Sequence, residues 1–94
     1  FAPEFAENQM QEKALIFENE KYQKVPNKYK MLVGIGVASA LGSDTCTQMW
    51  VKMAKQNGVS NEEIVEAINV ARYMKQVTVN DTIANSLNNL LENK

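Results

Sequence analysis

The chain of 94 residues contains no histidine and only one cysteine, Cys46. Without imidazole it can form neither a Ser-His or Cys-His nucleophile pair nor a histidine-ligated metal site. One cysteine cannot form a disulfide within the chain, and a transition-metal site would have to be built from carboxylates and one thiol. We therefore expect no metal, no cofactor and a reducing, cytoplasmic compartment.

The chain also lacks an excess of positive or negative charge and lacks a long apolar run. The net charge is −1, whereas a surface that binds nucleic acid or an anionic membrane needs a basic face. The longest apolar run, Met31 to Leu41, is too short to span a bilayer. We therefore expect neither nucleic acid nor a membrane as a partner. Because the chain begins with Phe1 and not with methionine, we expect that its start has been trimmed. The sequence leaves open whether a targeting signal was lost with the removed residues.

What is present indicates a small helical protein. Apolar residues make up 45% of the chain, and 94 residues leave room for one core, so residues 1–94 are predicted to form a single domain. Hydrophobic periodicity predicts an all-α bundle of four to five helices. The expected helices are Pro3 to about Tyr22, Asn27 or Lys28 to about Ala40, Ser43 or Asp44 to Asn57, Asn61 to about Lys75, and about Val79 to Glu92.

A β-branched stretch and a pair of glycines each predict a local feature of these helices. The β-branched stretch from Gln76 to Val79 has no partner strand elsewhere, so we interpret it as a joint between helices. Gly34 and Gly36 lie inside the second helix, where each costs about 1 kcal/mol relative to alanine. Close approach of a neighbouring helix explains them better than a ligand does.

The clearest helix boundary lies at Gly58, which is expected to end the third helix. Ser60 and Glu63 then have the spacing of a capping box, in which each side chain accepts a hydrogen bond from the backbone N–H of the other. Val59 and Ile64 flank this box at the positions of a hydrophobic staple. We assign the acidic residues here to capping and to a solvated helix face rather than to acid–base catalysis.

The third helix carries the candidate functional residues. Its apolar residues recur at the spacing of a buried helical stripe, which comprises Cys46, Met49, Trp50, Met53 and Ala54. We favour a small buried hydrophobe for Cys46 over a reactive thiolate in the first turn of a helix capped by Ser43. For Trp50 and Met49 we favour packing in the core or in a subunit interface.

The segment from Val25 to Met74 resembles the carboxymuconolactone decarboxylase superfamily, and within it the alkylhydroperoxidase D-like proteins. The resemblance rests on Val25-Pro26-Asn27-Lys28-Tyr29-Lys30-Met31-Leu32-Val33, on Cys46, Ala54 and Gly58, and on Glu62-Glu63-Ile64-Val65-Glu66-Ala67. The family pattern places a glutamate before a leucine and then Cys-x-x-Cys-x-x-x-His. In complete members the two cysteines cycle between dithiol and disulfide, while glutamate and histidine relay protons.

In the register set by Gly58 and Ile64, Cys46 matches the second cysteine of this motif and Ser43 the first. Trp50 stands at the histidine position and Met31 at the glutamate position. Serine cannot resolve an oxidised thiol, and neither tryptophan nor methionine can accept a proton. The resemblance therefore implies a degenerate site that cannot run the two-cysteine cycle.

We accordingly expect a structural or binding role. One alternative is a one-cysteine peroxidase or thiol oxidoreductase using Cys46, and a second, ranked after it, is a decarboxylase of the carboxymuconolactone type. The resemblance also implies a homo-oligomer (dimer, trimer or hexamer), with the helices around Val33–Val37 or Cys46–Met53 in the interface. A small-molecule ligand is possible, but the sequence does not identify it.

Overall fold

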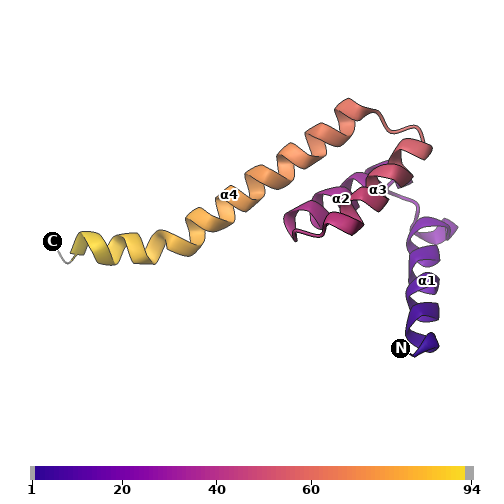
Figure 1. The fold of residues 1–94 in the computed structure, drawn as a ribbon, viewed down its shortest axis with the longest axis horizontal. Helices are drawn as coiled ribbons and strands as arrows, with labels where there is room; N and C mark the ends of the chain where they lie inside the picture. Colours follow the sequence, from indigo (N-terminus) through magenta and orange to yellow (C-terminus); the bar gives the residue numbers. More distant parts are fainter. Residues whose placement is uncertain (1, 93–94) are drawn as a thin grey trace.

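A computed structural model of the protein describes residues 2–92, and within this range it contains four α-helices, one short 3-10 helix and no strand (Figure 1). The elements are α1 (Pro3–Phe17), η1 (Glu20–Tyr22), α2 (Asn27–Ala40), α3 (Asp44–Gln56) and α4 (Asn61–Glu92). The all-α prediction is confirmed, and so are the bounds of α2 and α3 to within a residue.

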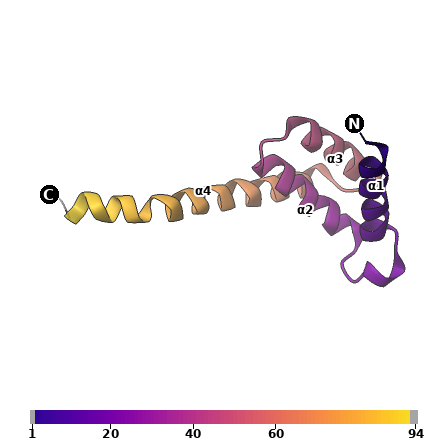
Figure 2. The same ribbon diagram turned by 90° about the horizontal axis from the view of Figure 1, so that it is seen from below.

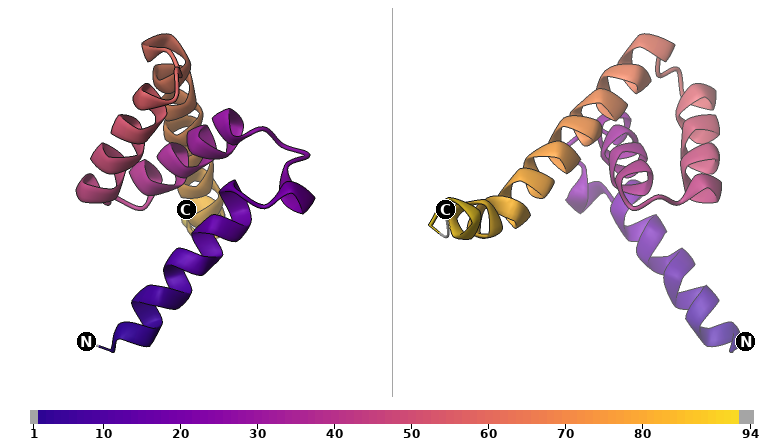
Figure 3. Two further views of the ribbon diagram at one scale, coloured as in Figure 1. Left: turned by 90° about the vertical axis from the view of Figure 1, so that its right-hand side faces the viewer. Right: turned by 60° about the vertical axis from the view of Figure 1, so that its left-hand side comes forward.

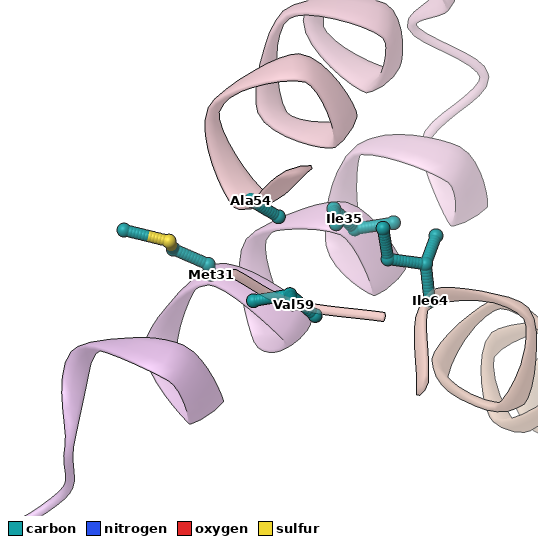
Figure 4. Close-up of a cluster of buried hydrophobic side chains, with 5 residues drawn as sticks. All are labelled: Met31, Ile35, Ala54, Val59 and Ile64. Carbon is teal, nitrogen blue, oxygen red and sulfur yellow. The ribbon is translucent and has the colours of Figure 1, made fainter. Parts of the chain in front are cut away.

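The core forms where α3 and the first half of α4 pack against α2. Its buried cluster, drawn in Figure 4, consists of Met31, Ile35, Ala54, Val59 and Ile64. Ile35 is fully buried in the middle of α2, between the residues that α3 and α4 contribute. Ile64 and Ala71 are buried on α4, whereas Glu62 and Glu66 are exposed, as expected for a solvated helix face.

The two glycines of α2 allow this close packing, as the sequence predicted. A Cβ atom at Gly34 would lie 3.4 Å from the Trp50 ring of α3. A Cβ atom at Gly36 would lie 3.9 Å from both the Ala67 carbonyl oxygen and the Ala71 Cβ of α4. The two positions therefore serve the two helix contacts of α2, one with α3 and one with α4.

The predicted boundary between α3 and α4 is confirmed. Gly58 has φ +83°, and the N–H of Val59 donates to the Ala54 carbonyl at 3.0 Å, so the last carbonyls of α3 are satisfied. The Glu63 N–H donates to Ser60 Oγ at 3.1 Å, and the Ser60 N–H donates to Glu63 Oε1 at 3.0 Å. These reciprocal bonds form the capping box at the start of α4.

The first helix is shorter than predicted, because it ends at Phe17 rather than near Tyr22. Asn19 Oδ1 accepts from the Lys21 N–H at 2.9 Å and caps the separate turn η1, an alternative to continuing the helix. The Asn27 side chain donates to the Phe17 carbonyl at 2.8 Å, and Lys30 Nζ donates to the Ile16 carbonyl at 2.6 Å. Two side chains of α2 therefore hold the end of α1.

The predicted joint at Gln76–Val79 is wrong, because α4 runs without interruption from Asn61 to Glu92. The stretch contains neither glycine nor proline, and β-branched residues cost a helix only a few tenths of a kcal/mol each. Thr78 Oγ1 donates to the Lys75 carbonyl at 2.7 Å, so this hydroxyl is satisfied within the helix. The two predicted C-terminal helices are one.

The second half of α4 extends away from the other helices in both Figure 1 and Figure 2. Every residue from 72 to 92 is exposed. Figure 3 shows α1 leaving the packed region in another direction. Within residues 2–92 no helix combines the length and the hydrophobicity that crossing a membrane requires.

Candidate functional site

The candidate site is a cleft of about 490 Å³ between α1 and α3. It brings Cys46 and Trp50 of α3 together with side chains of α1 that the sequence analysis did not single out. The lining residues are Gln9, Met10, Glu12, Lys13, Ile16, Phe17, Cys46, Met49, Trp50 and Met53. The cleft is therefore mostly apolar, with charged side chains contributed by α1.

Cys46 lies in the first turn of α3, and its side chain is exposed. Ser43 caps this helix as predicted, because its Oγ accepts a hydrogen bond from the Cys46 N–H at 3.3 Å. The interpretation of Cys46 as a hydrophobe buried within the chain is wrong. The core lies under the last turns of α3, where Ala54 is fully buried, and it does not extend to the first turn.

Met49 is also exposed, whereas Trp50 and Met53 are half-buried and pack against the core cluster. The predicted stripe on α3 therefore faces inward only in its second half. The alternative prediction, that Cys46 or Met49 is buried in a contact between subunits, stays a prediction.

Trp50 forms the floor of the cleft. Its ring lies 5.3 Å from the Phe17 ring of α1, measured between centroids, with an angle of 35° between the planes. The backbone of Gly34 in α2 also lies beside the indole. Lys13 Nζ lies 5.8 Å from the indole centroid, within the range of a cation–π interaction. The indole therefore packs between three helices.

Met31 does not belong to the cleft. It lies on α2 with only 6% of its surface exposed, and it packs in the cluster around Ile35 (Figure 4). Trp50 packs against the outside of the same cluster. The structure thus divides the four motif positions between the cleft, the start of α3 and the core.

The acidic residues at the start of α4 lie outside the cleft, as their assignment to capping requires. Glu63 forms an ion pair with Lys28 of α2. This pairing and the bonds from Ser60 lower the pKa of the Glu63 carboxyl to about 2. Among residues 2–92, no three acidic or thiol side chains are arranged to hold a metal ion.

Sequence reasoning missed Lys13 and Phe17 because α1 has no regular apolar stripe. Their place in the cleft depends on the contacts of Asn27 and Lys30 with the end of α1. Pro26 indicates a break in the helix after α1, but it does not indicate the direction that the chain takes there.

The family assignment comes from a comparison with protein-family models. Residues 3–80 match the model of the carboxymuconolactone decarboxylase family. No curated protein and no solved structure gives a significant match. The matched range covers most of the chain, from the start of α1 past the middle of α4. The chain therefore belongs to the carboxymuconolactone decarboxylase family.

Proposed function

We propose that the protein keeps the helical scaffold of its family without the two-cysteine peroxidase cycle, and that it has a binding or structural role. One observation carries this proposal. The side chains at the three changed motif positions each have a structural task, in capping at Ser43, in interhelical packing at Trp50 and in the core at Met31.

None of these three side chains can supply the chemistry that the family motif needs. A serine hydroxyl cannot form the disulfide that resolves an oxidised thiol. The indole N–H of Trp50 only donates, so it cannot take a proton. The Met31 thioether has no acidic proton and lies in an apolar cluster, away from Cys46.

The cleft between α1 and α3 supports the binding role. Its volume, about 490 Å³, is that of a small-molecule site, and its floor is the aromatic pair of Phe17 and Trp50. A flat apolar compound would stack on these rings, with the opposite charges of Glu12 and Lys13 beside it.

The proposal is tested by peroxide consumption with a dithiol reductant, comparing the native chain with Cys46→Ser. The loss of one positioned proton-transfer group costs about 10²–10⁴-fold in rate, and here a resolving thiol is absent as well. We expect both proteins to consume peroxide at the same background rate. Rapid, saturable turnover that the substitution abolishes would overturn the proposal.

The exposure of Cys46 favours a second candidate, one-cysteine thiol chemistry. Its thiolate would attack the O–O bond of a hydroperoxide, giving a sulfenic acid and releasing an alcohol or water. Two equivalents of an outside thiol would then return Cys46 to the thiol, with a disulfide and water as products. The exposed side chain of Cys46, at the edge of the cleft, would let a hydroperoxide reach its sulfur. The comparison with Cys46→Ser decides between the two.

A further inference from the structure

The second large hollow of the molecule lies between α2 and the first half of α4, on a different part of the surface from the cleft at Cys46. It has a volume of about 480 Å³ and is open to solvent. Its walls include Val33, Gly36 and Val37 from α2 and Ala67, Ala71 and Met74 from α4. Val33 and Val37 are 63% and 53% exposed, so this groove presents apolar surface that the rest of the chain does not cover.

The C-terminal part of α4, residues 79–92, carries a matching apolar stripe. We call this segment the tail. Five apolar residues lie along one side of it: Val79, Ile83, Leu87, Leu90 and Leu91. The first four recur at intervals of three or four, which places them on one side of the helix, and Leu91 lies next to Leu90 at the edge of this side. All five are exposed, and Figure 1 and Figure 2 show the tail projecting from the packed helices.

The tail cannot fill the groove of its own chain. One wall of the groove is α4 itself, between Ala67 and Thr78, and the tail continues that same helix. At a rise of about 1.5 Å per residue, Leu91 lies about 20 Å beyond Thr78 along the axis. At about 3.6 residues per turn the stripe also lies on roughly the opposite side of α4 from the groove. Both apolar surfaces therefore need a partner outside the chain.

The exposed area of the chain indicates that this partner is large. The chain exposes 7757 Å², whereas a compact monomer of 10.6 kDa exposes about 5,500 Å². The excess of about 2,300 Å² per chain is well above the roughly 800 Å² that each partner buries in a standard interface. For two chains it falls within the range of about 2,000–5,000 Å² of obligate homodimers. The radius of gyration, 18.1 Å, likewise exceeds the roughly 12 Å expected for this length.

We propose that the groove of one copy receives the tail of a second copy, and that the exchange is reciprocal. Each chain then supplies one groove and one tail, and the two contacts together form one self-complementary interface. The stripe around Leu87 packs against Val33, Val37 and Met74 of the other copy. The polar residues on the other side of the tail, among them Asn85, face solvent.

The test uses charged substitutions at exposed positions, which leave the fold of the single chain intact. Native protein at micromolar concentration is expected to sediment at twice the 10.6 kDa of one chain, or at an even multiple of it. Val37→Lys in the groove and Leu87→Glu in the tail are each expected to give a species of one chain with unchanged helix content. Matched controls are Val65→Lys, on the side of α4 opposite the groove, and Asn85→Glu, on the side of the tail opposite the stripe; they add the same charges and should leave the mass unchanged.

Mixing the two variants distinguishes this exchange from other dimers. In a mixed pair, the unchanged tail of the Val37→Lys chain meets the unchanged groove of the Leu87→Glu chain. The other contact then sets the new glutamate against the new lysine. We expect association to return in the mixture and to weaken as salt is added.

Three results would overturn the proposal. They are a native chain that remains a single 10.6 kDa species, variants that associate as the native chain does, and a mixture that stays dissociated. Loss of association in either control to the same extent as in its partner variant would also count against it. None of these outcomes depends on peroxide turnover, so this proposal and the proposed function can fail separately.

Discussion

The sequence resemblance assigns Met31 and Cys46 to two positions of one family motif, but the two side chains lie in opposite surroundings. Met31 is 6% exposed in the core between α2, α3 and α4, whereas Cys46 is exposed at the start of α3. A proton-transferring carboxylate at position 31 would have to leave water, but a thiol at position 46 does not. This difference supports the proposal that the chain keeps the family scaffold without the motif's chemistry, because Met31 stabilises the core whereas Cys46 remains accessible.

The strongest way to break this comparison is to place the family's carboxylate in the core. Met31→Glu is expected to lower the free energy of unfolding at pH 7 by about 3–5 kcal/mol, because burial raises a carboxyl pKa by several units and each unit corresponds to about 1.4 kcal/mol. Urea unfolding measures the change. Met31→Leu is the control and should cost less than about 1.5 kcal/mol.

The sign of the pH dependence sharpens this test. A raised carboxyl pKa destabilises the fold above the ordinary pKa of glutamic acid, so the deficit of Met31→Glu should shrink as the pH falls from 7 toward about 4 and stay constant below that. A variant as stable as Met31→Leu at pH 7 would mean that position 31 is hydrated and able to hold a catalytic carboxylate.

A smaller loss is expected at Trp50, which is half-buried between Phe17 and Gly34. Trp50→Ala should lower the free energy of unfolding by about 2–3 kcal/mol, less than the 3–5 kcal/mol typical of a fully buried aromatic side chain. Trp50→Phe keeps a ring against Phe17 and should recover at least half of that loss. Equal losses in the two variants would show that the contact with Phe17 contributes little.

Removing Ser60, which caps α4, should destabilise the fold more than removing Ser43, which caps α3. Ser60 takes part in a capping box with Glu63, whereas Ser43 accepts one bond of 3.3 Å from Cys46. Ser60→Ala is expected to cost about 1–2 kcal/mol and Ser43→Ala about 0.5–1 kcal/mol. Urea unfolding of both variants measures the difference, and the reverse order would contradict the role given to the box.

The smallest effect concerns the charge on Glu63. Its pKa is lowered to about 2, so its contribution to stability is present above its ordinary value of 4.5 and is lost as the pH falls toward 2. Glu63→Gln keeps an acceptor for the Ser60 N–H but removes the ion pair with Lys28. Its stability should therefore fall less than that of the native chain between pH 5 and pH 2. If the free energies of unfolding of both proteins fall equally between pH 5 and pH 2, the ion pair does not contribute to stability.

Features set by neighbouring residues could be predicted from the sequence. Gly58, Ser60 and Glu63 define a helix boundary through backbone conformation and short-range hydrogen bonds, and the structure has that boundary where it was predicted. The same holds for Ser43 as the cap of α3. The glycines of α2 indicated close contacts because glycine is costly within a helix and must be compensated by packing.

Features set by distant residues could not be predicted. The stripe on α3 is regular, but its periodicity does not tell which of its turns another helix covers, so the exposure of Cys46 was missed. The sequence did not indicate that α4 continues through Thr78, because β-branched residues are only slightly unfavourable in a helix and the packing of the chain decides whether the helix ends there. The cleft depends on Lys30 holding the end of α1, a contact across 14 positions in sequence.

The most direct test of the central claim restores the missing thiol alone, in Ser43→Cys. Because the first turn of α3 places positions 43 and 46 close together, treatment with peroxide should convert the two thiols to an intramolecular disulfide, seen as a loss of two hydrogens by mass spectrometry. With a dithiol reductant, however, peroxide turnover should stay at the background of the native chain, because Trp50 and Met31 still supply no proton transfer. Sustained turnover by Ser43→Cys would contradict the account, since it would show that one thiol, and not the changed tasks of three positions, separates this chain from an active peroxidase.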